Sequence, residues 1–191
     1  MSKLDKIKHV ANNYNHYLAM KDWSKGVVGS DVVMSQTRKG SSQRIADVPL
    51  QSPPEKDQWS LKIVTDVDKT CRFSAILFDF DFLGDIPCFR FDGDGGRHKN
   101  PFKEGVPLCE RFITTPHFHM YDETGASIAY KTEDLKLNQT EIMKSWTNIL
   151  HHFCAEENIQ ILEDVELTSG EFLFQTPNNL TDPLSGVIFD E

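Results

Sequence analysis

The sequence predicts an α+β fold, in which an antiparallel β-sheet carries an N-terminal and a C-terminal helix on one face. Apolar residues recur at helical spacing over residues 3–20 and 139–155, towards the two ends of the chain. Between them, residues 59–131 show consecutive segments of period-two alternation separated by short turns. A run of strands with helices only at its two ends is the pattern expected for an antiparallel sheet with helices packed on one face.

The N-terminal helix over residues 3–20 depends on a regular apolar stripe. Its members are Leu4, Ile7, Val10, Ala11, Tyr14, Tyr17 and Leu18. Gly26 and Gly29 follow the helix as breakers, and residues 27–36 indicate a strand pair or an edge strand. Residues 38–57 are polar, contain a Pro-Pro step and show little periodicity, so they are predicted to form a long loop or linker.

The central strands begin at residues 59–63, where apolar and polar side chains alternate as in a half-buried strand. Residues 71–82 form the clearest strand of the chain. Alternation separates its aromatic from its acidic side chains, with Phe78, Phe80 and Phe82 on one face and Asp79 and Asp81 on the other. The two aspartates are interpreted as the solvent-facing side of this strand.

Two further strands and a hairpin complete the predicted sheet. Gly84 and Asp85 turn the chain into a strand over residues 86–92. Residues 115–121 form the next strand, and residues 126–131 return antiparallel to it after a short turn. These segments follow one another without an intervening helix, which favours antiparallel pairing.

The second helix is predicted over residues 139–155. Asn138 and Glu141 have the spacing of a capping box at its start. Its apolar stripe consists of Ile142, Trp146, Ile149 and Phe153. This stripe is expected to pack on the sheet.

The domain organisation follows from these elements. It comprises an N-terminal helix and strand (1–37), a linker (38–57), a core α+β domain with the histidine motifs (58–157) and an acidic C-terminal segment (158–191). The last twenty residues contain two prolines and are expected to wrap the surface or fray.

Composition limits the classes of protein to which the chain can belong. Its 191 residues carry a net charge of -9, which disfavours a protein that coats duplex DNA by bulk charge. A transmembrane helix is not expected, because no run of about 18 apolar residues is present. The charged N-terminus lacks the apolar region of a signal peptide, and the four cysteines form no C-x-x-C pair. We therefore expect a cytoplasmic protein with reduced thiols and no membrane partner.

Three histidines concentrate the candidate chemistry in the middle of the chain. His117 and His119 are separated by one residue in a predicted strand, which places both imidazoles on one face. His98 follows a glycine-rich turn, and Asp92 and Asn100 would complete the set. As catalytic residues, one neutral imidazole would accept a proton while a protonated one delivers it. The alternative interpretation is a solvent-facing polar row on a half-buried sheet.

The loop around these residues carries a small positive charge, although the chain as a whole is acidic. Five basic and four acidic side chains lie within residues 90–111, a local charge of +1. Arg97, Lys99 and Asn100 are predicted to bind phosphate, because such groups beside the histidines would stabilise the charge that develops on phosphorus. A solvated loop of mixed charge is the alternative.

The same histidines also fit a metal site. Zinc or manganese would bind to His98, His117 and His119, with Cys109 or Glu123 as a further ligand. The H-x-H-x-x-x-E spacing that ends at Glu123 is similar to the first motif of cupin metal sites. The chain departs from the cupin pattern before this motif and lacks the later cupin histidine motif.

A longer pattern resembles a family of short uncharacterised bacterial and phage proteins. FRFDGDGGRHKNP, a spacer containing a cysteine, and TPHFHMYDE are similar to that family's L-R-L-D-x-N-G-x-x-H-x-N-P and P-H-x-H-x-Y segments. The resemblance covers residues 59–155, with a longer spacer and with Asp94 where the family has asparagine. It implies a shared fold and motif rather than an activity. A more distant similarity to small toxins of toxin–antitoxin loci implies, by association, an activity directed at nucleic acid.

Two functions from different classes follow as hypotheses. The first is a small cytosolic enzyme of a phage or mobile element, a histidine-dependent phosphodiesterase or ribonuclease-like protein that acts on RNA or a nucleotide. The second is a non-catalytic binding protein of a phage, defence or toxin–antitoxin system that covers a basic surface of a host or defence protein. The acidic surplus after residue 155 favours the second. A histidine-based metal-binding protein is a further alternative that fits either.

Overall fold

The computed structural model describes residues 2–27, 32–37, 40–52, 57–66, 68–160 and 167–169. Its helices are α1 (Lys3–Asn12), α2 (Tyr14–Asp22), the 3-10 helix η1 (Leu108–Arg111), α3 (Glu133–Ile142) and α4 (Trp146–Glu156). Its strands are β1 (Lys25–Val27), β2 (Val32–Gln36), β3 (Gln43–Ser52), β4 (Asp57–Asp66), β5 (Lys69–Asp79), β6 (Phe89–Asp92), β7 (His98–Lys99), β8 (Phe112–Ile113), β9 (His117–Tyr121), β10 (Ser127–Tyr130), β11 (Ile159–Gln160) and β12 (Leu167–Ser169).

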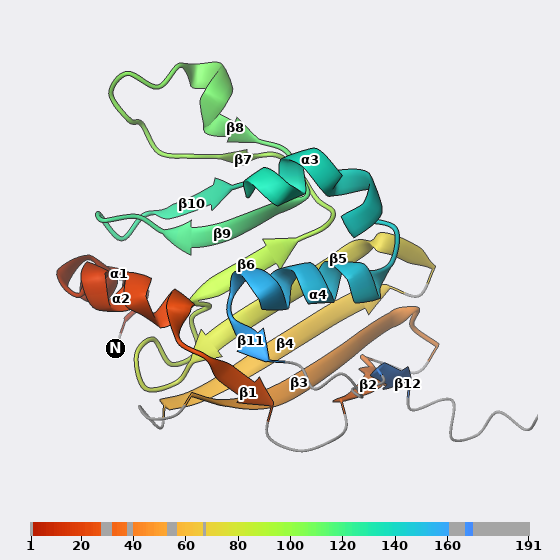
Figure 1. Cartoon of the computed structure of the whole chain (residues 1–191). Coiled ribbons are helices and arrows are strands. Elements are labelled where there is room, and N and C mark those ends of the chain that lie inside the picture. The colour runs from red at the N-terminus through yellow and green to blue at the C-terminus, as the bar shows by residue number, and fades with distance from the viewer. Residues whose placement is uncertain are drawn as a thin grey trace, which may run out of the picture.

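The strands form a curled and mostly antiparallel sheet with the order β10-β9-β6-β5-β4-β3-β1-β11 (Figure 1). β2 pairs with β3, and the two parallel pairs of the described residues are β1 with β11 and β2 with β12. β7 and β8 form a separate two-stranded ribbon. Together with the helices, this sheet gives an α+β fold, as the segregation of the predicted elements indicated.

Aromatic side chains pack the inner face of the sheet against two helices. Phe91 and Phe118 face each other across β6 and β9, with ring centroids 5.0 Å apart. Phe153 of α4 stacks on Phe118, and Tyr17 of α2 stacks on Phe89. Burial of each such ring stabilises the fold by about 2–3 kcal/mol. Because one face of β6 and β9 is buried in this way, alternation directs their other side chains to the opposite face.

The predicted loop over residues 38–57 is wrong, because most of it is β3. This ten-residue strand pairs with β4 along its whole length. Ala46, Val48 and Leu50 alternate into the core. Pro49 lies between the parts of β3 that pair with β2 and with β1, and among the described residues its pairing partner is Ser60 of β4. A residue without an N–H donor fits a stretch of strand that needs hydrogen bonds on one side.

The predicted exposure of Asp79 is also wrong. β5 ends at this residue, and its inner face is formed by Phe73, Ala75 and Leu77 rather than by the later phenylalanines. The buried carboxylate of Asp79 accepts hydrogen bonds from the backbone N–H groups of residues 81 and 82, both at 2.9 Å. It therefore stabilises the turn that ends the strand, and Phe80 is left 51% exposed.

The helix boundaries differ from the predicted ones at both ends of the chain. The predicted helix over residues 3–20 is divided into α1 and α2 at Asn13, whose φ of -122° and ψ of 31° are not helical. Its side-chain Nδ2 donates to the carbonyl of His9 at 2.9 Å. An asparagine side chain forms such local hydrogen bonds with the backbone readily, and this weakens helix propagation.

The predicted helix over residues 139–155 consists of parts of α3 and α4. The predicted capping box is wrong, because Asn138 lies inside α3. Thr132 caps α3 by accepting a hydrogen bond from the N–H of Leu135, and Ser145 caps α4 in the same way. Of the predicted acidic segment 158–191, only residues 158–160 and 167–169 are described, so the expectation for the last twenty residues lies outside the described residues.

Candidate functional site

The neighbouring strands β6 and β9 carry the candidate site on the face of the sheet opposite the aromatic core. Their antiparallel register places Arg90 opposite His119 and Asp92 opposite His117. The phenylalanines between these residues point into the core. Strand alternation therefore gathers four polar side chains on the outer face.

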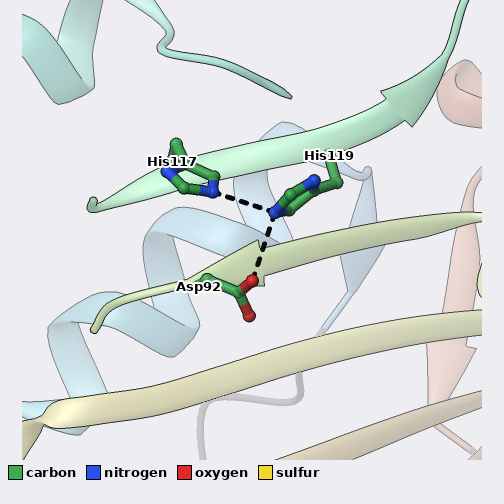
Figure 2. Close-up of side chains that lie close together, drawn as sticks. All are labelled: Asp92, His117 and His119. Atoms are coloured by element: carbon green, nitrogen blue, oxygen red, sulfur yellow. Dashed lines mark hydrogen bonds and ion pairs between the residues drawn. The ribbon is translucent and has the colours of Figure 1, made fainter. Parts of the chain in front are cut away.

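The rings of His117 and His119 and the carboxylate of Asp92 point toward one another (Figure 2). Nε2 of His117 lies 2.9 Å from Nε2 of His119, and the latter lies 3.1 Å from Oδ2 of Asp92. Potential ligand atoms of the three residues all lie within 4.8 Å of one another. The structure thus brings together the two histidines of the H-x-H motif and adds a carboxylate from the adjacent strand.

The carboxylate of Asp92 is held by two further residues. Its Oδ1 accepts hydrogen bonds from Oγ of Ser74 at 2.8 Å and from Nε of Arg90 at 2.7 Å. Nη2 of Arg90 lies 2.6 Å from Oδ2. Burial alone would raise the pKa of Asp92, but the hydrogen bonds from His119, Arg90 and Ser74 outweigh it and lower the pKa to about 2. Asp92 is therefore anionic at neutral pH.

His117 and His98 lie in an environment that favours their neutral form. Burial and the neighbouring His119 lower the pKa of His117 to about 4. The same two causes lower the pKa of His98, whose ring also hydrogen-bonds the backbone of Ser127. The centroid of the His98 ring lies 4.9 Å from that of His119 and 6.2 Å from that of His117. His98 is thus a neighbour of the cluster but is not one of the three converging residues.

The ribbon of β7 and β8 directs its cations away from the histidine cluster. The guanidinium carbon of Arg97 and the Nζ atom of Lys99 lie 4.5 and 5.7 Å from the centroid of the Phe112 ring. Lys99 pairs with Phe112 across the ribbon, so alternation turns His98 to the other face. The structure therefore does not bring these two predicted phosphate ligands to the cluster. Arg90 is the cation that lies there.

Asn100, the third predicted phosphate ligand, anchors the loop to the edge strand β10. Its Nδ2 donates to the carbonyl of Ala129 at 2.8 Å, and its Oδ1 accepts from the N–H of the same residue at 2.7 Å. The side-chain amide thus pairs with β10 as a neighbouring strand would. Both of its polar atoms are engaged, which gives Asn100 a structural role in holding His98 beside β9.

The two proposed additional metal ligands lie apart from the converging group. Cys109 is a free, exposed thiol in η1, and Glu123 is exposed in the turn between β9 and β10. Neither belongs to the group formed by Asp92, His117 and His119.

Sequence reasoning gave Asp92 only a supporting role and did not identify Ser74 at all. Period-two alternation does place Arg90 and Asp92 on one face of the predicted strand 86–92, which was a usable signal. Ser74 has no comparable signal. Its role depends on the pairing of β5 with β6, which sets it directly opposite Asp92.

No protein-family model, curated protein or solved structure matches this chain. The resemblance to the bacterial and phage family therefore stays a prediction. Among the helices of the described residues, none is both long and apolar enough to cross a membrane.

Proposed function

We propose that this protein is a metal-dependent hydrolase of phosphate esters, in which Asp92, His117 and His119 hold one divalent ion. The observation that carries the proposal is the convergence of three ligand atoms, separated by 2.9 and 3.1 Å, on the outer face of the sheet. Ligand atoms about 2.1 Å from a tetrahedral ion lie about 3.4 Å from one another, so small adjustments would suffice for binding.

The protonation pattern of the cluster supports an ion. Nε2 of His119 faces both the Asp92 carboxylate and Nε2 of His117. A single in-plane N–H or lone pair on this atom cannot be directed at both neighbours. A cation among the three atoms would use every lone pair, and the low pKa values of Asp92 and His117 keep those lone pairs available.

The contact between the two histidines argues against a metal-free acid–base pair. In a phosphoryl displacement, the attacking and leaving oxygens lie in line on opposite sides of phosphorus. An acid and a base that serve them must be separated by the width of the reacting group. Nε2 atoms only 2.9 Å apart leave no room for it.

The remaining groups fit a hydrolytic site. Three protein ligands leave an open position, where a divalent ion supplies Lewis acidity and activates a water molecule. His98 lies beside His119 and is fixed by the backbone of Ser127, so its ring is positioned to transfer a proton near that open position. Arg90 lies on the same face and is the nearby cation for an anionic substrate.

The test begins with metal content, measured by mass spectrometry on untagged protein purified without chelators. We expect about one zinc or manganese ion per chain, lost in Asp92→Asn and in the double variant His117→Ala/His119→Ala. His151→Ala, at an exposed position on α4, is the matched control and should retain the metal. Circular dichroism of each variant separates loss of metal from loss of fold.

Activity is then assayed on p-nitrophenyl phosphate, bis-p-nitrophenyl phosphate, cyclic nucleotides and single-stranded RNA. Metal-dependent turnover of at least one ester is the expected result. A metal that binds without turnover would leave the ion structural and favour the non-catalytic binding protein. Iron with oxygen consumption would overturn the hydrolytic assignment, since two histidines and one carboxylate also hold ferrous iron.

A further inference from the structure

We infer that Arg90 recognises the substrate's phosphoryl oxygens and that the substrate is a small phosphate monoester rather than a nucleic acid. This inference rests on the proposed function and names the substrate class of the same site. Three observations carry it: the orientation of the guanidinium, the hollow beside it, and the pairing of two other cations on this face.

The guanidinium of Arg90 uses only one of its two hydrogen-bonding edges on Asp92. Nε and Nη2, which form the side-on edge, bind the carboxylate at 2.7 and 2.6 Å. An arginine has five N–H donors, so three remain, and two of these form the end-on edge. The side chain is 44% exposed, and these donors are accessible to a second oxyanion. Because Asp92 holds the guanidinium in place, little side-chain entropy would be lost on binding.

A hollow of about 120 Å³ adjoins Arg90. Its lining includes Arg90, His119, Tyr121 and Ser127. A volume of this size admits several water molecules, so the hollow has room for a phosphoryl group. It lies beside His119, so a group bound in it would adjoin the proposed metal position.

Two other basic side chains on the outer face of the central strands are already paired. Lys62 lies 3.6 Å from Asp47, and Arg72 lies 3.6 Å from both Asp66 and Asp94. A polynucleotide would need a row of unpaired cations along its path, whereas a terminal phosphate needs one. The net charge of -9 would repel a polymer further. Among the described residues, this face of the sheet therefore offers a single anchor for an anion near the histidines, which suits a terminal phosphate better than a polynucleotide.

Binding of inorganic phosphate to zinc-loaded protein tests this inference by titration calorimetry. We compare wild type with Arg90→Gln and Arg90→Lys, and use Arg97→Gln as the matched control because Arg97 lies over Phe112 on the other face of β7. Arg90→Gln should weaken phosphate binding by about 10- to 100-fold, and Arg90→Lys should restore only part of it. Arg97→Gln should leave it unchanged.

Zinc affinity, measured on the same variants with a competing chelator, distinguishes recognition from positioning. Zinc affinity that falls as steeply as phosphate affinity in Arg90→Gln would overturn the inference, because Arg90 would then act only through Asp92. Unchanged phosphate binding in Arg90→Gln, or no phosphate binding by zinc-loaded wild type, would also overturn it. Turnover of bis-p-nitrophenyl phosphate or RNA in preference to p-nitrophenyl phosphate would refute the monoester assignment and leave the hydrolase intact. Failure to bind any metal would refute the proposed function instead.

Discussion

Replacing Glu157 by glutamine should stabilise the protein above neutral pH. This residue follows α4 and is fully buried, and its carboxyl oxygens have no hydrogen-bond partner among the described residues. The nearby Lys25 is also buried, but its ammonium donates to the backbone carbonyls of Lys21, Trp23 and Glu157 at 3.3, 2.9 and 2.8 Å. The lysine is thus satisfied by the backbone, whereas the carboxyl is not.

The structure sets the size and sign of the effect. Burial raises the pKa of Glu157 from 4.5 to about 8, although Lys21 and Lys25 oppose the rise. Over this interval the folded protein keeps a proton that the unfolded chain releases, so the free energy of unfolding falls as the pH rises. The loss is about 1.4 kcal/mol per pH unit and about 4–5 kcal/mol over the whole interval. Above pH 8, the lowered pKa of Lys25, also about 8 because of burial, gives the opposite slope up to 10.5.

The assay is urea unfolding of wild type and Glu157→Gln at pH 5, 6, 7 and 8. The difference between the two curves isolates residue 157, because contributions common to both proteins cancel. These include the rise in stability between about pH 4 and 6.5 caused by the lowered pKa values of His98 and His117. We expect the difference to grow by about 1.4 kcal/mol per pH unit in favour of the variant.

A control and a contrary outcome follow from the same reasoning. Glu123→Gln changes an exposed carboxyl in a turn, so its stability relative to wild type should not vary steeply with pH. Parallel curves for wild type and Glu157→Gln, or a variant less stable than wild type at pH 8, would contradict a protonated Glu157 in the folded protein. Either result would mean that Glu157 is ionised in the folded protein and stabilised by Lys25.

Three further predictions concern the site and the core beneath it. Ser74→Ala removes the 2.8 Å hydrogen bond to Asp92 and should weaken zinc binding by about 10- to 100-fold in chelator competition, with a loss below about 2-fold arguing against its positioning role. Phe118→Ala empties a fully buried ring position and should lower the free energy of unfolding by about 3–5 kcal/mol, against about 1 kcal/mol for Phe118→Leu, as measured by urea unfolding. Asn100→Ala releases the backbone of Ala129 and should accelerate hydrogen exchange of that amide, and unchanged protection would show that the loop is anchored elsewhere.

The parts of the fold that sequence predicted well are those with a strong local pattern. Residues 59–63 lie within β4, and the last five residues of the predicted strand 115–121 form β9. β3 was missed because polar residues and a proline occupy most of its outer face, while its inner face has only three apolar residues, Ala46, Val48 and Leu50. Helix ends were misplaced because several residues near them, including Asn138, have side chains suited to capping. Which of these caps a helix depends on where the chain packs.

The candidate site shows the same division. Spacing alone placed His117 and His119 on one face, because a strand alternates with a period of two. The sequence also determined the net charge and the absence of a long apolar run. Only the tertiary structure decided that this face is the one away from the aromatic core, and that Asp92 and Arg90 of β6 lie opposite the histidines. Strand pairing joins residues 27 positions apart, and no local pattern encodes which strands become neighbours. Arg97 and Lys99 point away from the histidine cluster for a similar reason. The register of β7 with β8 sets the direction of each side chain, and composition does not encode that register.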